Sequence, residues 1–411
     1  MEPVAKATDD IKPVLGKIRI QILDVIRGFS ILGILAVNAD GFAAPQAASL
    51  NPPMWIFANE GWSAISYWIM DTFFHEKFLT LFSMLFGVSL FLVGGERADK
   101  HKSRILKRRL GILFIFGILH GFGIWWGDIL SLYAATGALM YFFRSWTPKT
   151  LLCRGVIFYT VMVCLQIPAA VLSFGPPQTT GAVKENFVPK TTMQIKRKIE
   201  IVEAMELAKK SWTAAYQLNA QEYMKLLVGD LRLVPQTLAL MMIGLSLYKS
   251  GFLAGRSSTR CYVAIMLFGV LALTMTGWLS WQTDILEKTI LGERGFMLLL
   301  SPVVAVAYVA SFTLFVKTTG SKLMSPVAAT GRMAFTNYIT QSLLMTSIFY
   351  GGRGAMMGEV DRPELWAITV AIWALQLAWS TLWLSRFEMG PFEWIWRCLT
   401  LGRYVSLIKA I

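Results

Sequence analysis

Charged residues are scarce in this chain of 411 residues, where Asp, Glu, Lys and Arg together make up only 16%. Hydrophobic residues account for 55%, and the mean hydropathy is +0.53. So little charge excludes an ordinary soluble domain and indicates a polytopic membrane protein. The formal net charge of +14 would suggest nucleic-acid binding in a soluble protein. Here topology explains it, because Lys and Arg accumulate in short cytoplasmic loops, and we expect no nucleic-acid partner.

Cysteine and histidine are also rare, with four and three residues of each. The cysteines have no paired spacing, so neither a disulfide framework nor a zinc motif can be read. The chain also lacks a P-loop, a Rossmann fingerprint and a G-x-S-x-G elbow. A cleavable signal pattern is missing from the first 20 residues, so the first helix is expected to be an uncleaved anchor. We expect no metal and no tightly bound cofactor.

Long apolar runs take up most of the sequence. They predict an all-α, polytopic transmembrane bundle of about ten membrane-spanning helices. An aromatic-rich segment at 61–75 is expected to lie at the outer interface and to lead into the second helix. The predicted spans are 22–42, 77–94, 109–126, 128–144, 155–174, 232–249, 261–281, 296–316, 332–350 and 364–386.

The distribution of basic residues predicts the topology. With the N-terminus inside, the six cytoplasmic segments hold 24 Lys and Arg, and the four short outer loops hold 4. This ratio predicts that both termini are cytoplasmic. The chain is expected to have five parts. A cytoplasmic N-terminal tail (1–21) precedes a first helical half that carries the candidate site (22–174). An extracytoplasmic polar helical loop (175–231), a second helical half (232–386) and a cytoplasmic amphipathic segment (387–411) follow.

The polar loop 175–231 contains a helical pattern from about 191 to 227, in which apolar residues repeat every three or four positions. Its 8 basic and 6 acidic residues leave it nearly neutral. The pattern fits an outer helical cap or an interface-lying helix. A solvated connector between the two halves of the bundle fits equally well.

The first predicted span carries an acid, a base and an amide. Asp24 and Arg27 are i,i+3 neighbours, and Arg27 and Asn38 lie eleven residues apart on the same face, about 16 Å along the helix. Charge inside a bilayer is costly, so such residues usually mark function. The alternative is an intrahelical ion pair near the inner interface, with Asn38 as a helix C-cap.

His120 lies in the outer half of the third predicted helix, at a depth similar to that of Asn38. A histidine can act as a general base, and a carboxylate such as Asp128 can fix its tautomer. Eight residues of continued helix would separate the two by about 12 Å, so they pair only if the intervening glycines break the helix. The alternatives are a hydrogen-bonded core histidine and an N-cap of the fourth helix.

Two charged clusters could extend this site. His75 and Lys77 lie where the chain re-enters the membrane, and they could line an outer mouth or simply anchor the helix. Arg108 and Arg109 end a basic run, which could receive a phosphorylated donor on the cytoplasmic face. The same run also serves as a topology signal and a contact for anionic lipids.

For other polar and aromatic residues, too, both a functional and a purely structural role are open. Asn337 and Gln341 share one face of the ninth predicted span, followed by Ser342, and could line the cavity or join helices by hydrogen bonds. Trp125, Trp126 and Tyr133 fit an interfacial aromatic belt, and Tyr133 is retained as a candidate for binding.

These segments together resemble the YeiB-like family of bacterial membrane proteins of unknown function, over nearly the whole chain. Matched in order, the motifs are specific, and the resemblance implies a location in the bacterial cytoplasmic (inner) membrane. The matching stretches are Leu23-Asp24-Val25-Ile26-Arg27-Gly28-Phe29 with Asn38, Lys77-Phe78 to Phe86-Gly87, Arg109 through His120 to Gly127-Asp128-Ile129-Leu130 with Tyr133, Gly331-Arg332-Met333-Ala334-Phe335-Thr336-Asn337-Tyr338, and Gly390-Pro391-Phe392-Glu393-Trp394 with Trp396-Arg397.

The YeiB-like family in turn looks like a branch of the transmembrane acyltransferases. These include sugar and peptidoglycan O-acetyltransferases and the lysosomal heparan glucosaminide N-acetyltransferase. In the O-acetyltransferases, a first-helix Arg is followed after ten residues by a catalytic His. That spacing holds from Arg27, but the slot contains Asn38. The heparan enzyme resembles an Arg-to-Asn version with its His further on, whereas residues 43–60 here contain no His. His120 is the replacement base that we favour, then His75.

The resemblance implies an acyltransferase that moves an acyl group from a cytoplasmic acyl-CoA to a hydroxyl or amine acceptor at or across the membrane. Whether the protein is an enzyme stays open, because a transporter of a small anionic or amphiphilic solute and a non-catalytic lipid-binding protein fit the same residues. Membrane lipids are expected partners, and a homodimer is an open alternative to a monomer. The candidate catalytic residues are His120, Asn38 and Asp128, and the candidate donor- or substrate-binding residues are Arg27, Asp24, His75, Lys77, Arg108, Arg109, Tyr133, Asn337 and Gln341.

Overall fold

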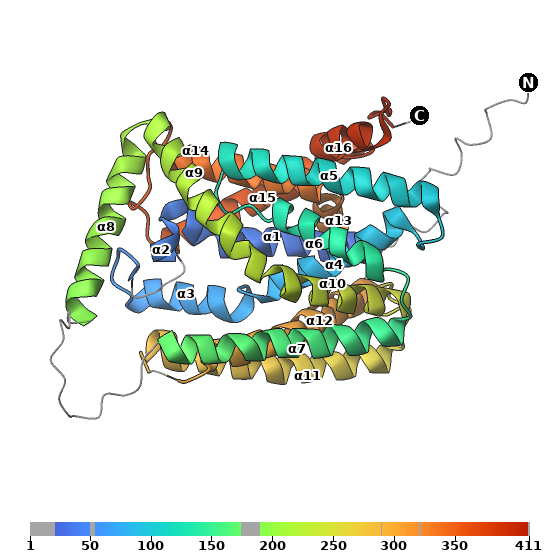
Figure 1. Ribbon diagram of the computed structural model, residues 1–411, viewed down its shortest axis with the longest axis horizontal. Helices are drawn as coiled ribbons and strands as arrows, with labels where there is room; N and C mark the ends of the chain where they lie inside the picture. The colour runs from blue at the N-terminus through green and yellow to red at the C-terminus, as the bar shows by residue number, and fades with distance from the viewer. Residues whose placement is uncertain (1–20, 50–53, 174–189, 289, 320–321, 410–411) are drawn as a thin grey trace, which may run out of the picture.

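The computed structural model describes residues 21–49, 54–173, 190–288, 290–319 and 322–409. In these ranges all regular structure is helical, apart from one isolated bridge between Phe387 and Ile408. Most helices run parallel or antiparallel to one long axis and form a bundle (Figure 1). The predicted all-α class is confirmed. The predicted tail at 1–21, except its last residue, and the first part of the predicted loop, 175–189, lie outside the described ranges.

Each stretch predicted to span the membrane corresponds to one helix, because apolar runs of this length form helices in a bilayer. The helical pattern at 191–227 corresponds to two helices, α8 and α9. The elements are α1 (Gln21–Ala43), α2 (Gln46–Ser49), α3 (Gly61–Phe73), α4 (Lys77–Gly94), α5 (Lys100–Gly123), α6 (Leu130–Phe143), α7 (Pro148–Ser173), α8 (Lys190–Lys210), α9 (Trp212–Gly229), η4 (Asp230–Arg232), α10 (Val234–Lys249), α11 (Thr259–Ser280), η5 (Trp281–Ile285), α12 (Glu293–Thr319), α13 (Ser325–Arg332), α14 (Ala334–Phe349), α15 (Arg362–Arg386) and α16 (Pro391–Leu401).

Six helical stretches in the described ranges are long and apolar enough to cross a membrane, and the bent pair of α9 and α10 would make a seventh. These helices indicate a membrane protein. Three of the predicted spans fall short of this measure, because the first half of α5 is basic and because α6 and α14 have only 14 and 16 residues. The count of ten spans therefore stays a prediction.

The aromatic segment at 61–75 belongs to a long helical rod. α3 and α4 together form one apolar stretch of 34 residues from Gly61 to Gly94. A helix of that length is about 51 Å long, more than the hydrocarbon core of about 30 Å. The rod is interrupted at Glu76, whose φ of 62° lies in the left-handed region. The segment therefore leads directly into α4, as predicted, and its position at the outer interface stays a prediction.

α1 occupies the centre of the bundle and packs against α4, α12, α13, α14 and α15. Glycines allow its closest crossing: a Cβ on Gly28 would lie 2.0 Å from the carbonyl oxygen of Val327, and one on Gly331 would lie 1.9 Å from that of Asp24. Small residues at such crossings let membrane helices approach closely. The first-helix motif is therefore locked against α13 at its N-terminal end.

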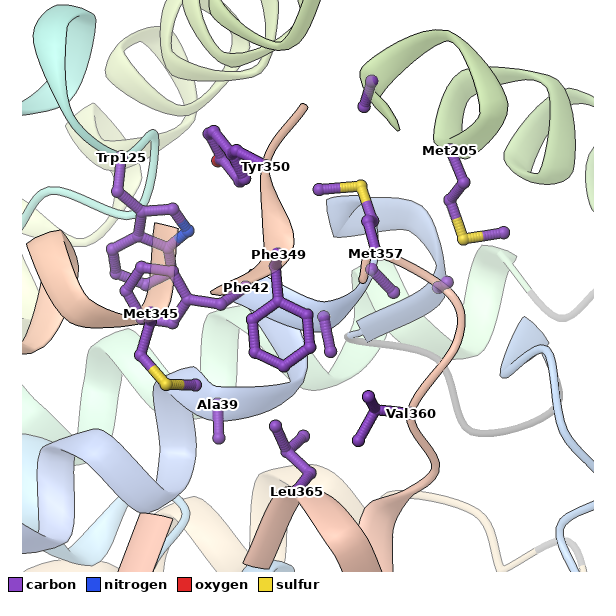
Figure 2. Packing of buried hydrophobic residues seen from close by; sticks show 14 of the residues in the cluster. Ala39, Phe42, Trp125, Met205, Met345, Phe349, Tyr350, Met357, Val360 and Leu365 are labelled. Atoms are coloured by element: carbon purple, nitrogen blue, oxygen red, sulfur yellow. The ribbon is translucent and has the colours of Figure 1, made fainter. Parts of the chain in front are cut away.

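α8 lies across one end of the bundle, opposite the end where α1 begins and α15 finishes (Figure 1). Beneath it, the last turn of α1, the turn after α5 and the end of α14 share a hydrophobic cluster (Figure 2). Phe42 stacks on Trp125 at 3.9 Å between ring centroids, and Met205 of α8 reaches the same cluster. Trp125 and Trp126 are buried here, so the interfacial belt predicted for them is wrong.

Candidate functional site

The end of α5 places His120 next to a sharp turn. The His120 carbonyl accepts the N–H groups of Ile124, at 2.8 Å, and Trp125, at 3.0 Å, which closes the helix after Gly123. The chain then turns back and starts α6 at Leu130. The helix break on which a pairing of His120 with Asp128 depends is therefore present. Gly121 does not break the helix, since it lies within α5.

His120 connects two other polar side chains. Its Nδ1 lies 3.1 Å from Oδ1 of Asp128, and its Nε2 lies 2.9 Å from Oγ of Ser342 on α14. All three side chains are buried, with exposures of 1% for His120, 2% for Asp128 and 1% for Ser342. The structure thus contains a buried Asp–His–Ser chain of hydrogen bonds, drawn from the α5–α6 turn and from α14.

Asp128 also caps α6. Its carboxylate accepts the N–H groups of Leu130, at 3.1 Å, and Ser131, at 2.9 Å. Both roles considered for Asp128, N-cap and partner of His120, are therefore present at once. Because every neighbour of the carboxylate is a donor, Nδ1 of His120 carries the proton, and the Nε2 lone pair faces the Ser342 hydroxyl.

Close helix packing holds this geometry. A Cβ on Gly117 would lie 2.4 Å from the Ser131 nitrogen and 2.8 Å from Oδ2 of Asp128. Only glycine allows the start of α6 to lie this close to α5. The Tyr338 ring lies 4.9 Å from the His120 ring, and its hydroxyl accepts the N–H of Ile129 at 3.3 Å. Aromatic rings around a buried imidazole keep water away, which strengthens its hydrogen bonds.

Ser342 was not among the predicted site residues. It follows Gln341 on α14, and 222 positions separate it from His120. Its hydroxyl lies 3.4 Å from the carbonyl oxygen of Tyr338, an ordinary contact for serine inside a helix. No local spacing signals that α14 brings this residue to α5, so only the packing of the two helices identifies it.

The polar stripe of α1 does not join this chain. Arg27 pairs with Asp24 at 3.1 Å and donates to Oγ of Ser89 at 3.4 Å. Ile31 and Leu35, which lie between Arg27 and Asn38 along the helix, are buried in hydrophobic packing. Asn38 is half-buried, and among the described residues no hydrogen bond or ion pair links it to His120 or Asp128.

Asn337 and Gln341 join helices. Gln341 donates to the Ile31 carbonyl of α1 at 3.1 Å and to Oε1 of Gln376 on α15 at 2.8 Å. Asn337 donates to Oγ of Ser380 at 3.0 Å and to a backbone carbonyl of α13. The structure therefore favours the alternative in which these amides fasten helices over the one in which they line a cavity.

Tyr133 lies in the core of the bundle. Its ring stacks on Phe82 and Phe86, and its hydroxyl is 3.0 Å from Oγ of Ser83. Its exposure of 1% places the side chain inside the bundle rather than in an aromatic belt that faces the lipid.

His75 and Lys77 belong to a second polar network, at the break between α3 and α4. Nδ1 of His75 lies 2.9 Å from Oδ1 of Asp71, and Nζ of Lys77 donates to the Asp71 carbonyl at 2.8 Å. Lys77 is buried, and His75 keeps about a quarter of its side-chain surface exposed. The structure thus brings these two predicted residues together, but around Asp71 rather than around His120.

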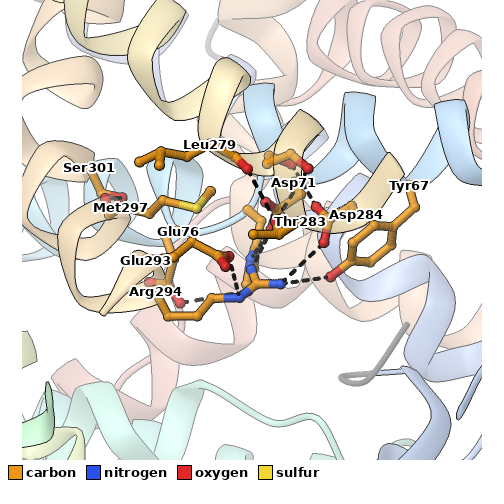
Figure 3. A network of polar contacts seen from close by, with 12 residues as sticks. Tyr67, Asp71, Glu76, Leu279, Thr283, Asp284, Glu293, Arg294, Met297 and Ser301 are labelled. Carbon is orange, nitrogen blue, oxygen red and sulfur yellow. Dashed lines mark hydrogen bonds and ion pairs between the residues drawn. The ribbon is translucent and has the colours of Figure 1, made fainter. Parts of the chain in front are cut away.

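Arg294 at the start of α12 connects this network to η5, the turn that follows α11 (Figure 3). Its Nη1 donates to Oδ1 of Asp71 at 2.8 Å, and its other nitrogens lie 3.8 Å from Oδ1 of Asp284 and 3.5 Å from Oε1 of Glu293. Among the described residues, Oδ2 of buried Asp71 has no hydrogen-bond partner. Asp284 lies in η5, a π-helical turn of a kind frequent at functional sites.

Arg108 and Arg109 lie at the opposite end of α5 from His120. The Arg109 guanidinium stacks on the Trp396 ring of α16 at 3.5 Å, and Trp396 Nε1 donates to the Arg109 carbonyl at 3.0 Å. Arg108 is exposed. Eleven residues separate Arg109 from His120, about 16 Å along the helix. The basic run and the buried histidine are thus at different depths of one helix.

α16 also caps α14. Oε1 of Glu393 accepts the N–H groups of Phe335, at 2.7 Å, and Thr336, at 3.1 Å, and Oε2 accepts the Thr336 hydroxyl. A carboxylate at a helix N-terminus satisfies amides that the helix itself leaves unpaired. The helix that carries Ser342 is therefore anchored at its other end by the C-terminal amphipathic segment.

A small pocket lies one helical turn beyond His120. Gly123 and Ile124 line it together with Asn219 of α9 and with Tyr350 and Arg353, which follow α14. Its volume of about 20 Å³ is room for a water molecule. Burial lowers the pKa of Arg353 below the usual arginine value. Because that usual value is so high, the side chain stays charged.

Comparisons with known proteins agree with the motifs. The model of a family described as "Protein of unknown function (DUF418)" matches residues 247–403, a range that contains α14. The chain is 32% identical to the uncharacterized protein YxaH of Bacillus subtilis (strain 168), covering 97% of this chain and 98% of that protein. It is also 32% identical to the uncharacterized protein YeiB of Escherichia coli (strain K12), covering 92% and 95%.

A third relative is an uncharacterized 39.9 kDa protein from the amylase 3' region of Bacillus acidopullulyticus, 24% identical over 95% of this chain and 96% of that protein. No solved structure matches the chain. The agreement with YxaH and YeiB extends over almost the full length of all three proteins, so it includes both the α5–α6 turn and α14. The chain therefore belongs to the YeiB-like DUF418 family of bacterial proteins of unknown function.

Proposed function

We propose that this protein is a membrane-embedded acyltransferase that uses His120 as its general base. The observation that carries the proposal is the buried His120, held by Asp128 on one nitrogen and facing a hydroxyl with the other. A carboxylate that fixes the tautomer, and an imidazole whose free lone pair faces a hydroxyl, are the parts that acyl transfer requires. Asn38 is retained as the donor to the developing oxyanion.

The donor is an acyl-CoA that approaches from the cytoplasmic face of the inner membrane, and the acceptor carries a hydroxyl or an amine. Arg108 supports this donor because it is exposed and can contact phosphate, with Arg109 and Arg27 near the same end of the bundle. The acyl group has to travel about 16 Å along α5 to reach His120. In the proposed topology the chain crosses the membrane ten times, and both termini lie in the cytoplasm.

Turnover of acyl-CoA by the purified full-length protein tests the proposal. We expect wild-type protein to release CoA from acetyl-CoA or palmitoyl-CoA in the presence of a panel of hydroxyl and amine acceptors. His120→Ala should release it at least 100-fold more slowly, because the base is lost. Equal rates for the two proteins would remove the support for this function, provided that both elute as folded protein from a sizing column.

The network around Asp71 favours a second candidate, a transporter of a small anionic or amphiphilic solute. Buried charges inside membrane helices mark solute or proton pathways, and Arg294 of this network keeps 47% of its side chain exposed. Proteoliposomes without CoA test this candidate. Uptake of organic anions that Asp71→Asn abolishes, and that His120→Ala leaves intact, would favour transport over acyl transfer.

A further inference from the structure

We infer that Ser342 is the nucleophile of this site and carries the acyl group as a serine ester between donor and acceptor. The inference rests on the proposed acyl transfer and adds a covalent intermediate to it. Its structural basis is the direction of the Asp128–His120–Ser342 chain. The proton on His120 points to Asp128, so the only lone pair on the imidazole faces Ser342.

The position of Ser342 decides between direct and two-step transfer. With its Oγ 2.9 Å from Nε2, Ser342 occupies the place that an acceptor hydroxyl would need in order to give its proton to His120. Direct transfer would require an acceptor to displace a serine that is 1% exposed. Attack by Ser342 itself needs no such exchange, because base and nucleophile are already within reach of each other.

A purely structural role does not explain the contact as well. The Ser342 hydroxyl lies 3.4 Å from the Tyr338 carbonyl, so it has an acceptor within its own helix. A serine inside a helix needs no hydrogen-bond partner beyond such a carbonyl. Ser347 lies on the same helix, is exposed, and donates to the Leu343 carbonyl at 2.6 Å. Ser347 is therefore a matched reference for Ser342.

The reaction balances with the groups at hand. Ser342 Oγ attacks the thioester carbonyl of an acyl-CoA while His120 Nε2 takes its proton, and the C–S bond breaks as the C–O bond forms. The CoA thiolate leaves with the proton from His120. An acceptor hydroxyl or amine then attacks the ester and gives its proton to His120, which returns it to Ser342 as the C–O bond to the serine breaks.

The surroundings of His120 differ towards the two ends of α5. The small pocket lined by Gly123, Ile124 and Tyr350 lies one turn beyond His120, at the end of the bundle under α8. The basic end of α5 lies on the other side. A covalent ester lets donor and acceptor arrive at different times, because the acyl group stays on the protein between the two half-reactions.

The experiment is acylation without an acceptor. Full-length protein is mixed with acetyl-CoA or palmitoyl-CoA, quenched in acid and analysed by intact-protein and peptide mass spectrometry. We expect wild type and Ser347→Ala to gain one acyl group, located on Ser342, and Ser342→Ala to gain none and to lose at least 100-fold in transfer to acceptors. Ser342→Cys should carry the group as a thioester that neutral hydroxylamine removes, which shows reactivity independently of the alanine variant.

The outcomes separate this inference from the function on which it rests. If Ser342→Ala transfers acyl groups to acceptors at the wild-type rate, or if wild type transfers without ever carrying an acyl group on Ser342, the inference is wrong and direct transfer stands. If wild type consumes neither acyl-CoA under any condition, the proposed function fails, and the inference falls with it. Acyl-Ser342 that is discharged on adding acceptor supports both.

Discussion

The two buried polar networks of this bundle differ in how their charges are balanced. The first, Asp128–His120–Ser342, contains one carboxylate, and each of its contacts is a hydrogen bond between a donor and an acceptor. The second contains the four carboxylates of Asp71, Glu76, Asp284 and Glu293 and the two basic side chains of Lys77 and Arg294, with His75 beside them. One oxygen of Asp71 stays unpaired among the described residues.

This difference separates a site arranged for proton transfer from one arranged for charge compensation. In the first network the Ser342 proton has one base within reach, Nε2 of His120, and Asp128 holds the imidazole without taking the proton. In the second, Arg294 is shared by several carboxylates, so removing any one charge redistributes the others. We therefore expect substitutions in the first network to change chemistry with little change in folding, and substitutions in the second to change folding first.

Paired asparagine substitutions give the sharpest contrast. Asp128→Asn keeps a side chain that caps α6, because Asn and Asp are equally good N-caps. Its amide favours the other His120 tautomer, which turns an N–H rather than a lone pair towards Ser342. Acyl transfer should fall by about 10²–10⁴-fold at nearly unchanged thermal stability. Asp71→Asn should alter transfer far less, and a comparable loss in both variants would remove the distinction between the networks.

Arg294→Met tests the second network through stability. It leaves the buried Asp71 carboxylate without its strongest partner, at a cost of about 1–3 kcal/mol in the free energy of unfolding. A fully buried pair would cost more, but the Arg294 side chain is 47% exposed. Melting followed by fluorescence size exclusion measures the change. The double variant Asp71→Asn/Arg294→Met should recover part of the loss, and full additivity would contradict the coupling.

The sequence allowed much of the fold to be predicted, because a bilayer makes apolar runs the dominant signal. The boundaries of α4 agree with the predicted 77–94 residue for residue. Apolar content does not distinguish a helix end at the membrane interface from a helix end covered by α8. For this reason the sequence predicted an interfacial belt for Trp125 and Trp126, which are buried. Aromatic residues at a helix end look the same in both situations.

The candidate site was predictable only where its parts are close in sequence. His120 and Asp128 are eight residues apart, and the glycines between them signalled that the helix could turn back. Ser342 comes from a helix more than two hundred residues away, and the residue predicted there was its neighbour Gln341. The same limit hid Arg294, which meets Asp71 only because α12 packs beside the break between α3 and α4. Long-range packing decides such pairs, and one sequence does not encode it in a readable pattern.

Gly117→Ala changes the packing that supports the first network. Its Cβ would lie 2.4 Å from the Ser131 nitrogen and 2.8 Å from Oδ2 of Asp128, so the start of α6 has to move away. We expect a loss of about 1–3 kcal/mol in stability and a fall in transfer rate, because Asp128 is displaced from His120. Gly111→Ala is the matched control on the same helix, since nothing lies within 4 Å of its Cβ. That control should leave both properties unchanged or raise stability slightly. Equal behaviour of the two variants would show that the close approach of α5 and α6 does not matter.

Glu393→Ala should have the smallest effect, because it touches the first network only through the far end of α14. It removes the carboxylate that accepts the N–H groups of Phe335 and Thr336, and such caps contribute about 1 kcal/mol. Glu388→Ala is the control, since in the described part of the chain Glu388 forms its hydrogen bonds through backbone atoms. If α14 is a rigid element, transfer changes as little as stability does. If transfer falls much more than stability in Glu393→Ala alone, α16 controls the position of Ser342, and the first network depends on the end of the bundle that carries α16 as well as on the α5–α6 turn.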